Sequence, residues 1–267
     1  MEHQAKSELV DIGANLTHGS FRQDLEAVIQ RARIAGVTTI VLTGASVEGS
    51  EEAVKLAADR APALYATAGV HPHEAKSFTQ LTLSDLRALA SHPAVRAVGE
   101  CGLDYHRNLS PRNAQLSAFE AQLELAVELQ LPVFIHDREA HEDMLALLKR
   151  YRDRIADAVV HCFTGQRHEL AAYLDLDLHI GITGWICDER RGLHLRELVR
   201  EIPGRRLMLE SDAPYLLPRT IKPPPSHRRN EPAFLPYVLE AVAQSVGKPA
   251  TEVAQETTQT ARAFFRM

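Results

Sequence analysis

Four side chains of the types that bind metal ions stand at the ends of apolar segments in this chain. Two are histidines, His136 and His161, and two are acids, Glu100 and Asp212; each comes at or shortly after the end of a short apolar run. Burying an unpaired carboxylate costs several kcal/mol, and a divalent cation removes that cost. Imidazole combined with carboxylate oxygen suits zinc, manganese, iron or magnesium, and the carboxylates favour magnesium and manganese. The four residues therefore indicate a divalent-metal site and a metal-dependent hydrolase.

The apolar segments that carry these residues have the length of buried β-strands. Eight such segments follow one another, and their ends are separated by roughly 20 to 36 residues, about the length of one strand–helix unit. This spacing favours a closed (β/α)8 barrel, in which strand ends and the loops after them carry the chemistry. A doubly wound open sheet has the same periodicity and stays as the alternative fold. We expect strands at Leu9–Gly13, Val37–Thr43, Ala63–Val70, Val95–Glu100, Val133–His136, Ala158–His161, Leu178–Thr183 and Arg206–Glu210.

Amphipathic segments between these strands predict helices. The clearest begins at Ser110-Pro111, an N-cap followed by proline in the first turn. Another is expected over Glu139–Arg150, and the final segment, Ala233–Phe265, predicts two helices joined at Gly247-Lys248-Pro249. A Pro-rich insertion, Pro223–Pro232, follows the eighth strand and should therefore lie over the mouth of the barrel.

Composition is that of a globular protein with an acidic balance. The 267 residues are 45% hydrophobic and 24% charged, with a formal net charge of -5. A barrel of about 250 residues commonly forms one domain, so we expect a single domain over residues 1–267 and a monomer. No signal peptide is expected at residues 1–6 and no segment is apolar enough to cross a membrane, which predicts a cytoplasmic protein without membrane contact. With no overall basic field, a polyanionic substrate must be held by local cations or by a metal.

The three cysteines form no CxxC pair, and their odd number argues against a disulfide framework. Cys101 and Cys162 each follow a proposed ligand by one residue. Because neighbouring side chains in a strand face opposite ways, both thiols are expected to point toward the helix layer. We interpret them as small buried apolar residues in preference to zinc ligands.

Several residues near the expected mouth could bind substrate. His71 stands at the end of the third strand segment, Arg107 follows Glu100, and Arg228 and Arg229 belong to a basic group after the eighth strand. Two basic loops at one face of an acidic protein indicate an anion-binding rim. The alternative is that these basic side chains are ordinary solvated surface charges, which give the same sequence pattern. Trp185, after the seventh strand, could stack a nucleobase or pack a loop. No dinucleotide, Walker or serine-hydrolase motif occurs.

The order of these motifs along nearly the whole chain resembles the TatD-type deoxyribonuclease family. The resemblance implies a (β/α)8 barrel of the metal-dependent hydrolase superfamily and magnesium-dependent phosphodiester hydrolysis, trimming single-stranded DNA or RNA from the 3′ end in the cytoplasm. It also matches Glu100, His136, His161 and Asp212 to the family's metal ligands. The segments that carry it are Val10–Thr17, Gly69–His73, Gly99–Asp104, Pro132–His136, His161–Gly165, Gly181–Trp185, Glu210–Leu216 and Arg228–Pro232.

One departure concerns the first strand, where many relatives carry an HxH pair that completes a two-metal site. Here the corresponding positions are Gly13 and Asn15. Glycine has no side chain and an asparagine carbonyl is a weaker, neutral ligand, so we expect one tightly held metal and a weak second site. Magnesium is the expected metal, with manganese or zinc as alternatives. Gly13→His with Asn15→His is expected to strengthen the second site.

The mechanism that we expect uses Asp212 as both metal ligand and general base, with Glu100 as a further catalytic and ligating carboxylate. A rival enzymatic hypothesis is hydrolysis of an amide or ester in a small molecule, because the same scaffold serves that chemistry. A third is a binding protein without catalytic activity. The basic rim argues against a small neutral substrate, and the complete set of four ligands argues against a protein that has lost its chemistry.

Overall fold

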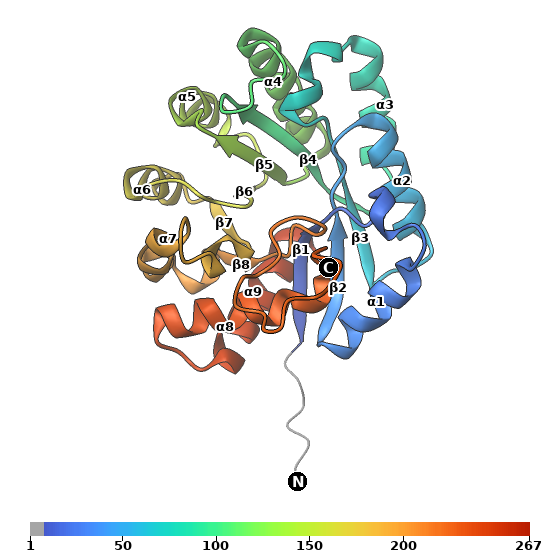
Figure 1. Ribbon diagram of the computed structural model, residues 1–267. Coiled ribbons are helices and arrows are strands. Elements are labelled where there is room, and N and C mark those ends of the chain that lie inside the picture. The colour runs from blue at the N-terminus through green and yellow to red at the C-terminus, as the bar shows by residue number, and fades with distance from the viewer. Residues whose placement is uncertain (1–7) are drawn as a thin grey trace.

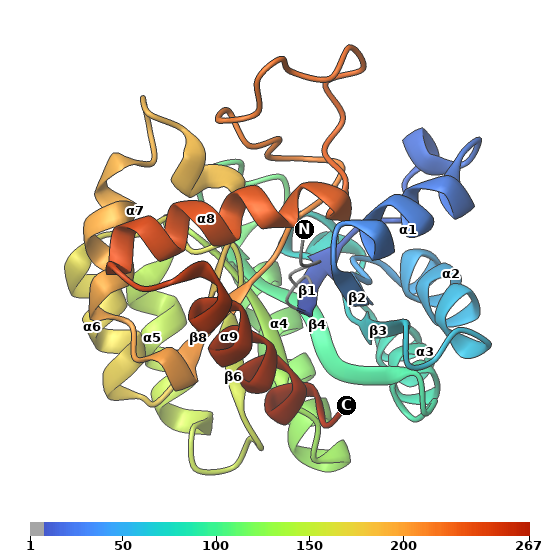
Figure 2. The same ribbon diagram turned by 90° about the horizontal axis from the view of Figure 1, so that it is seen from below.

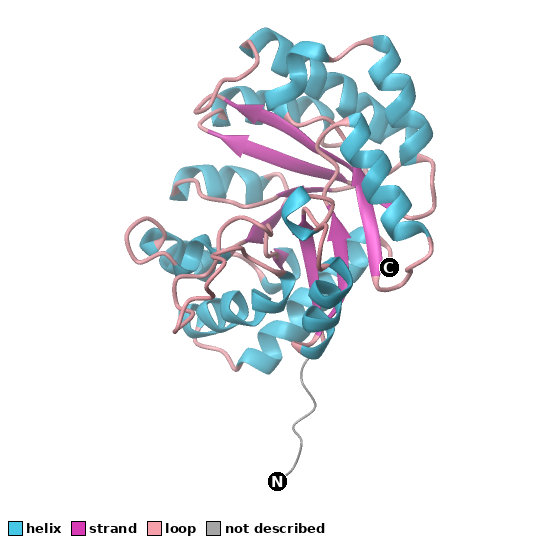
Figure 3. Cartoon of the chain, turned by 45° about the vertical axis from the view of Figure 1, so that its right-hand side comes forward, coloured by secondary structure: helices cyan, strands magenta, loops and turns pink. Residues whose placement is uncertain are grey.

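The computed structural model describes residues 8–267 and confirms the predicted barrel (Figures 1 and 3). Within this range, eight parallel strands form one sheet in the order β1 to β8, each strand pairing with the next along the chain. The strands are β1 Leu9–Ala14, β2 Val37–Leu42, β3 Leu64–Ala68, β4 Val95–Asp104, β5 Val133–Arg138, β6 Ala158–Val160, β7 His179–Ile182 and β8 Leu207–Leu209. The expectation for residues 1–6 lies outside the described residues.

The sheet nearly closes on itself where β8 meets β1. Beyond β8, Ala213 forms a parallel bridge with Ala14, and the Asn15 amide donates to the Ala213 carbonyl at 2.7 Å. The buried carboxylate of Asp11 accepts a hydrogen bond from the Ser211 amide at 2.8 Å across the same seam. These contacts join the first and last strands, which an open doubly wound sheet would leave apart.

Helices surround the sheet, as the amphipathic segments predict. They are α1 Leu25–Ile34, α2 Val47–Ala58, α3 Gln80–Ala90, α4 Arg112–Leu129, α5 His141–Tyr151, α6 Arg167–Asp175, α7 Leu193–Leu198, α8 Leu235–Val246 and α9 Ala250–Phe265. Short 3-10 turns connect them: η1 Gly19–Phe21, η2 Pro72–Ser77, η3 Gly184–Cys187, η4 Val199–Glu201, η5 Gly204–Arg206 and η6 Pro232–Phe234. The helix predicted after Ser110-Pro111 and the pair joined at Gly247 are confirmed. The N-cap prediction for Ser110 was wrong, because Pro111 occupies the cap position and the Ser110 hydroxyl donates to the His73 carbonyl at 2.7 Å. No helix within residues 8–267 is long and apolar enough to span a membrane.

The apolar core has two parts. Most buried apolar residues lie between the strands and the surrounding helices. A smaller group fills the barrel interior, with Phe134 from β5 and Met208 from β8, and it continues into Phe264 and Phe265 of α9. Helix α9 thus packs its last turn against the interior residues (Figure 2). The barrel is a filled core, which leaves the carboxyl ends of the strands to form the site.

Candidate metal centre

The segments at the carboxyl ends of the strands enclose a cavity of about 350 Å³, which we call the metal cavity. Every strand end or following loop from β1 to β6 contributes a lining residue, and so does the segment after β8. The lining residues are Asn15, Ala45, His71, His73, Glu100, Arg107, His136, Asp137, Arg138, His161, Cys162, Thr164, Asp212 and Tyr215. All four ligands predicted from the sequence are in this group.

Glu100 of β4 is the centre of the cluster. Its Oε1 lies 2.8 Å from His161 Nε2, 3.0 Å from His136 Nδ1 and 3.3 Å from His71 Nε2. Burial alone would raise the pKa of Glu100, but the three neighbouring imidazoles hold it well below its usual value. A buried carboxylate that stays ionised among imidazoles is a ready ligand for a divalent cation.

A second carboxylate, Asp104 at the end of β4, was not predicted as part of the site. It is 3% exposed, and its Oδ2 lies 2.8 Å from His73 Nε2 and 3.3 Å from His136 Nε2. Its Oδ1 accepts a hydrogen bond from the Arg107 amide at 2.7 Å. Burial opposes ionisation, but these partners keep the pKa of Asp104 below its usual value. Asp104 therefore orients the His136 ring and anchors the loop that carries Arg107.

Glu210, just after β8, fixes His161 from the other side. It is fully buried, accepts a hydrogen bond from the Cys162 amide, and lies 3.3 Å from His161 Nδ1. A carboxylate at one nitrogen of an imidazole fixes the ring so that the other nitrogen can bind a metal. Here that other nitrogen is Nε2, which faces Glu100.

Asp212 lines the cavity from a residue with a positive φ of 53°, and its amide donates to the Gly13 carbonyl at 2.9 Å. Burial raises the pKa of Asp212 to about 8; His161 opposes this rise, and the nearby Glu210 and Glu100 add to it. Three carboxylates in one buried region repel one another, and a divalent cation would remove that repulsion. The donor set of the cavity therefore fits a metal ion.

The tightest group of ligand atoms differs in part from the predicted quartet. Ligand atoms of His71, Glu100 and His136 all lie within 4.8 Å of one another. His161 and Asp212 line the same cavity but do not belong to this group. His71, which the sequence analysis assigned to substrate binding, is thus placed among the potential ligands, because the loop after β3 turns its ring toward Glu100.

Gly13 cannot be exchanged freely for the histidine of many relatives. A Cβ atom at Gly13 would lie 2.7 Å from Glu210 Oε2 and 3.1 Å from Phe134 Cζ. Because Glu210 is held by Cys162 and His161, it has little room to move. The expectation that Gly13→His would simply complete a second metal site is therefore opposed by the packing, although Asn15 does line the cavity.

The predicted orientation of Cys162 was wrong, whereas Cys101 lies in the core between strands and helices as expected. Cys162 lines the metal cavity. β6 ends at Val160, and Cys162 adopts a positive φ of 46°, so the alternation of side chains in a strand does not extend to it. Burial raises the pKa of this thiol well above its usual value.

The predicted substrate-binding arginines are separated by the fold. Arg107 is exposed and lines the metal cavity. Arg228 is exposed but lines a different cavity beside Pro224, since the segment between β8 and α8 extends away from the barrel (Figure 2). Arg229 does not match its predicted role: its guanidinium forms ion pairs with Asp24 and Glu231.

Arg138 is a further residue that the sequence analysis missed. It ends β5, two positions after His136, so the alternation in a strand would have placed both on the same face. It lines the metal cavity, and its Nη1 donates to Thr164 Oγ1 at 3.1 Å. No ion pair involves Arg138 among the residues that the structure describes, so its charge is available to an anion.

A barrel with imidazoles and carboxylates gathered at the carboxyl ends of its strands defines a metal-dependent hydrolase. Residues 10–266 match the family model described as TatD related DNase, and the chain belongs to this family. It is 51% identical to proteins named 3′-5′ ssDNA/RNA exonuclease TatD from Pantoea vagans and Edwardsiella piscicida, covering 97% of this chain and 100% of each relative. Among solved structures, YJJV, a TatD homolog from Escherichia coli K12, is 28% identical with a TM-score of 0.89, covering 98% of this chain and 100% of that one.

Proposed function

We propose that this chain is a metal-dependent exonuclease that removes nucleotides from the 3′ end of single-stranded DNA and RNA. Relatives with that name share about half of its residues over nearly its whole length. The structural observation that carries the proposal is Glu100, a buried carboxylate that contacts three imidazoles at the carboxyl end of the barrel. We propose magnesium as the metal, with manganese or zinc as alternatives.

The residues of the metal cavity would bind the metal ion and activate the attacking water molecule. Glu100, His71 and His136 would hold the cation, together with His161 and Asp212 from the same cavity. A bound cation would polarise a phosphoryl oxygen and lower the pKa of a water molecule to about 7–9. Asp212 would accept the proton of the attacking water as general base, while Glu100 stabilises the charged site.

Cations around the cavity would position the strand. Arg107 at the rim and Arg138 at the end of β5 would contact phosphate oxygens, for which the guanidinium fork is well suited. Arg228 would bind the strand farther out, because it lines a separate cavity. Arg229 is occupied by Asp24 and Glu231 and would act only by stabilising the loop.

Three further proposals concern the whole molecule. Residues 1–267 would act as a single domain, as a monomer, in the cytoplasm. The three cysteines form no disulfide bond with one another, which suits a reducing compartment. Size-exclusion chromatography with light scattering and fractionation of producing cells would test these points.

A time course on oligonucleotides labelled at the 5′ or the 3′ end tests the activity. We expect single-stranded DNA and RNA to shorten from the 3′ end in the presence of magnesium or manganese, and EDTA to stop the reaction. A phosphorothioate linkage at the 3′ end should block it. Internal fragments from a blocked oligonucleotide would contradict an exonuclease, and turnover of an amide or ester panel without nuclease activity would favour the rival hydrolase.

A further inference from the structure

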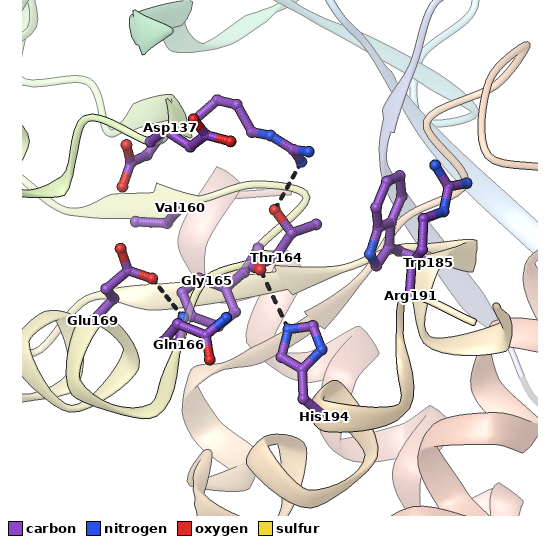
Figure 4. Close-up of a pocket in the computed structure, with 12 residues that line it drawn as sticks. Asp137, Val160, Thr164, Gly165, Gln166, Glu169, Trp185, Arg191 and His194 are labelled. Atoms are coloured by element: carbon purple, nitrogen blue, oxygen red, sulfur yellow. Dashed lines mark hydrogen bonds between the residues drawn. The ribbon is translucent and has the colours of Figure 1, made fainter. Parts of the chain in front are cut away.

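A second cavity of about 330 Å³, drawn in Figure 4, shares three lining residues with the metal cavity. Asp137, Arg138 and Thr164 line both cavities, so the two cavities adjoin at these residues. This volume is at the small end of the range for small-molecule pockets and suits one nucleotide better than a strand. We call it the base cavity because of the ligand argued for below.

Trp185 of η3 provides an aromatic surface in the base cavity. The Arg191 guanidinium lies 4.4 Å from the ring centroid, and that of Arg138 lies 5.5 Å from it. Backbone packing holds the tryptophan in place, since its amide donates to Thr183 Oγ1 and a Cβ at Gly192 would lie 1.9 Å from its carbonyl oxygen. Arg and Trp side chains held in this way form a platform on which nucleobases stack.

The Arg191 side chain is 61% exposed, and an ion pair keeps its guanidinium beside the indole. Its Nε and Nη2 donate to Asp188 Oδ2 at 3.1 and 3.0 Å, and Asp188 is only 4% exposed. Because the ion pair holds the guanidinium beside the indole, both groups are in place before a ligand enters. A preorganised surface binds more tightly, since less side-chain freedom is lost on binding.

The remaining walls carry polar groups that can form hydrogen bonds to a base. Figure 4 shows Gln166 and Glu169 across the cavity from Trp185, with Thr164 and His194 between them. His194 Nε2 lies 3.3 Å from the Thr164 carbonyl oxygen, which ties α7 to the loop after β6. The cavity thus combines an aromatic surface, polar groups and, on the side of the metal cavity, the guanidinium of Arg138, which forms no ion pair among the described residues.

We propose that the base cavity binds the 3′-terminal nucleotide of the substrate, with its base stacked against Trp185 and its phosphate beside Arg138 at the border of the metal cavity. This proposal rests on the proposed exonuclease function and assigns the leaving nucleotide to a specific place. It would also account for removal of nucleotides from the 3′ end of the strand, because a cavity of this size holds one nucleotide and not a continuing strand.

The first test measures binding without catalysis. Trp185 is the only tryptophan in the chain, so its fluorescence reports on this cavity alone. In EDTA, dAMP is expected to quench the fluorescence in a saturable way, excited where the base does not absorb, whereas deoxyribose 5-phosphate and inorganic phosphate leave it unchanged. Absence of a base-dependent change up to millimolar dAMP would overturn the proposal.

Variants then separate this cavity from the metal site. Calorimetry with dAMP should show about 5- to 150-fold weaker binding for Trp185→Leu, the range for losing one stacked base, and near-normal binding for Trp185→Tyr. Because Trp185 also packs on the core, Arg191→Met is a second variant, and we expect it to weaken binding about 2- to 10-fold. Arg190→Met is its matched control, since the exposed Arg190 does not line this cavity.

Kinetics with magnesium complete the test. Wild-type protein should have a higher KM for an oligonucleotide whose 3′-terminal nucleotide is abasic than for an intact one, and Trp185→Leu should remove most of this difference. If intact oligonucleotides are degraded but both substrates have the same KM in every variant, the base cavity has no such role. If the wild-type protein degrades neither substrate yet binds dAMP, the proposed function fails and the nucleotide site stands.

Discussion

Replacing Arg229 should destabilise the protein, whereas replacing its neighbour Arg228 should not. Arg229 Nη2 donates to Glu231 Oε1 at 2.7 Å and to Asp24 Oδ2 at 2.8 Å, and its guanidinium lies 4.5 Å from the centre of the Phe21 ring. These contacts tie the segment before α8 to the residues that precede α1. Arg228 is exposed and makes no such ion pair among the described residues.

The magnitude follows from the burial of the two carboxylates. The Glu231 side chain is 2% exposed, so loss of its hydrogen bond to a cation should cost about 1.5–3 kcal/mol. Arg31 remains bound to Glu231, which prevents the larger loss expected for a fully unpaired buried charge. Asp24 is 37% exposed, and its pair with Arg229 should add at most about 1 kcal/mol.

Arg229→Ala should therefore lower the free energy of unfolding by about 2–4 kcal/mol and Tm by roughly 5–12 °C. Thermal and urea unfolding followed by circular dichroism measure both quantities. Arg228→Ala should stay within about 0.5 kcal/mol of wild type while raising KM for oligonucleotides and reducing its salt dependence. Equal stability of the two variants, or a KM effect confined to Arg229→Ala, would refute the structural role of Arg229.

Three further outcomes are expected. Asp212→Asn should fold normally by circular dichroism and lose about 10²–10⁴-fold in kcat, and near-normal turnover would exclude it as the base. His71→Gln should weaken metal binding in calorimetry much more than His73→Gln, and equal losses in the two variants would show that His71 is not a ligand. Calorimetry of the wild type should find one tight metal site, and two tight sites would contradict the one-metal expectation. Burial opposes ionisation of Glu231, but two arginines hold the pKa of this carboxyl below its usual value. The ionised Glu231 therefore stabilises the folded protein fully above about pH 5, and this contribution declines as the pH falls below about 4.3. Glu231→Gln should flatten this acid limb of the stability profile measured by urea unfolding, and an unchanged limb would show that Glu231 does not contribute to it.

The strands, and the end of the barrel at which the functional residues lie, could be predicted from the local sequence pattern. Buried parallel strands are continuous apolar runs. A polar residue at the carboxyl end of such a run is therefore expected to lie at the mouth of the barrel. Glu100, His136, His161 and Asp212, each at or near the end of such a run, line one cavity as this pattern predicts. Boundaries were less accurate where the backbone turns, as at Glu139, whose positive φ of 55° delays the start of α5.

Other features depend on residues that are far apart in the sequence. Arg229 contacts Asp24 across 205 positions, and no periodicity in either segment reports such a pair. The position of Gly13 beside Glu210 also depends on residues that are distant in the sequence, because it follows from the closure of the first strand against the last. Cys162 faces the cavity since its strand ends two residues earlier, which the apolar run alone does not reveal.

Local sequence determined the strands, the helices and the chemical types of the side chains at the mouth, because each depends on the order of apolar and polar residues over a few positions. Only the tertiary structure decided that His71 joins Glu100 and that Arg229 is used in an ion pair. It also decided that Trp185 and Arg191 line a cavity next to the metal site. These outcomes depend on how loops of different strands meet in space, and the distance between two loops is set by barrel closure and packing, not by the residues within either loop.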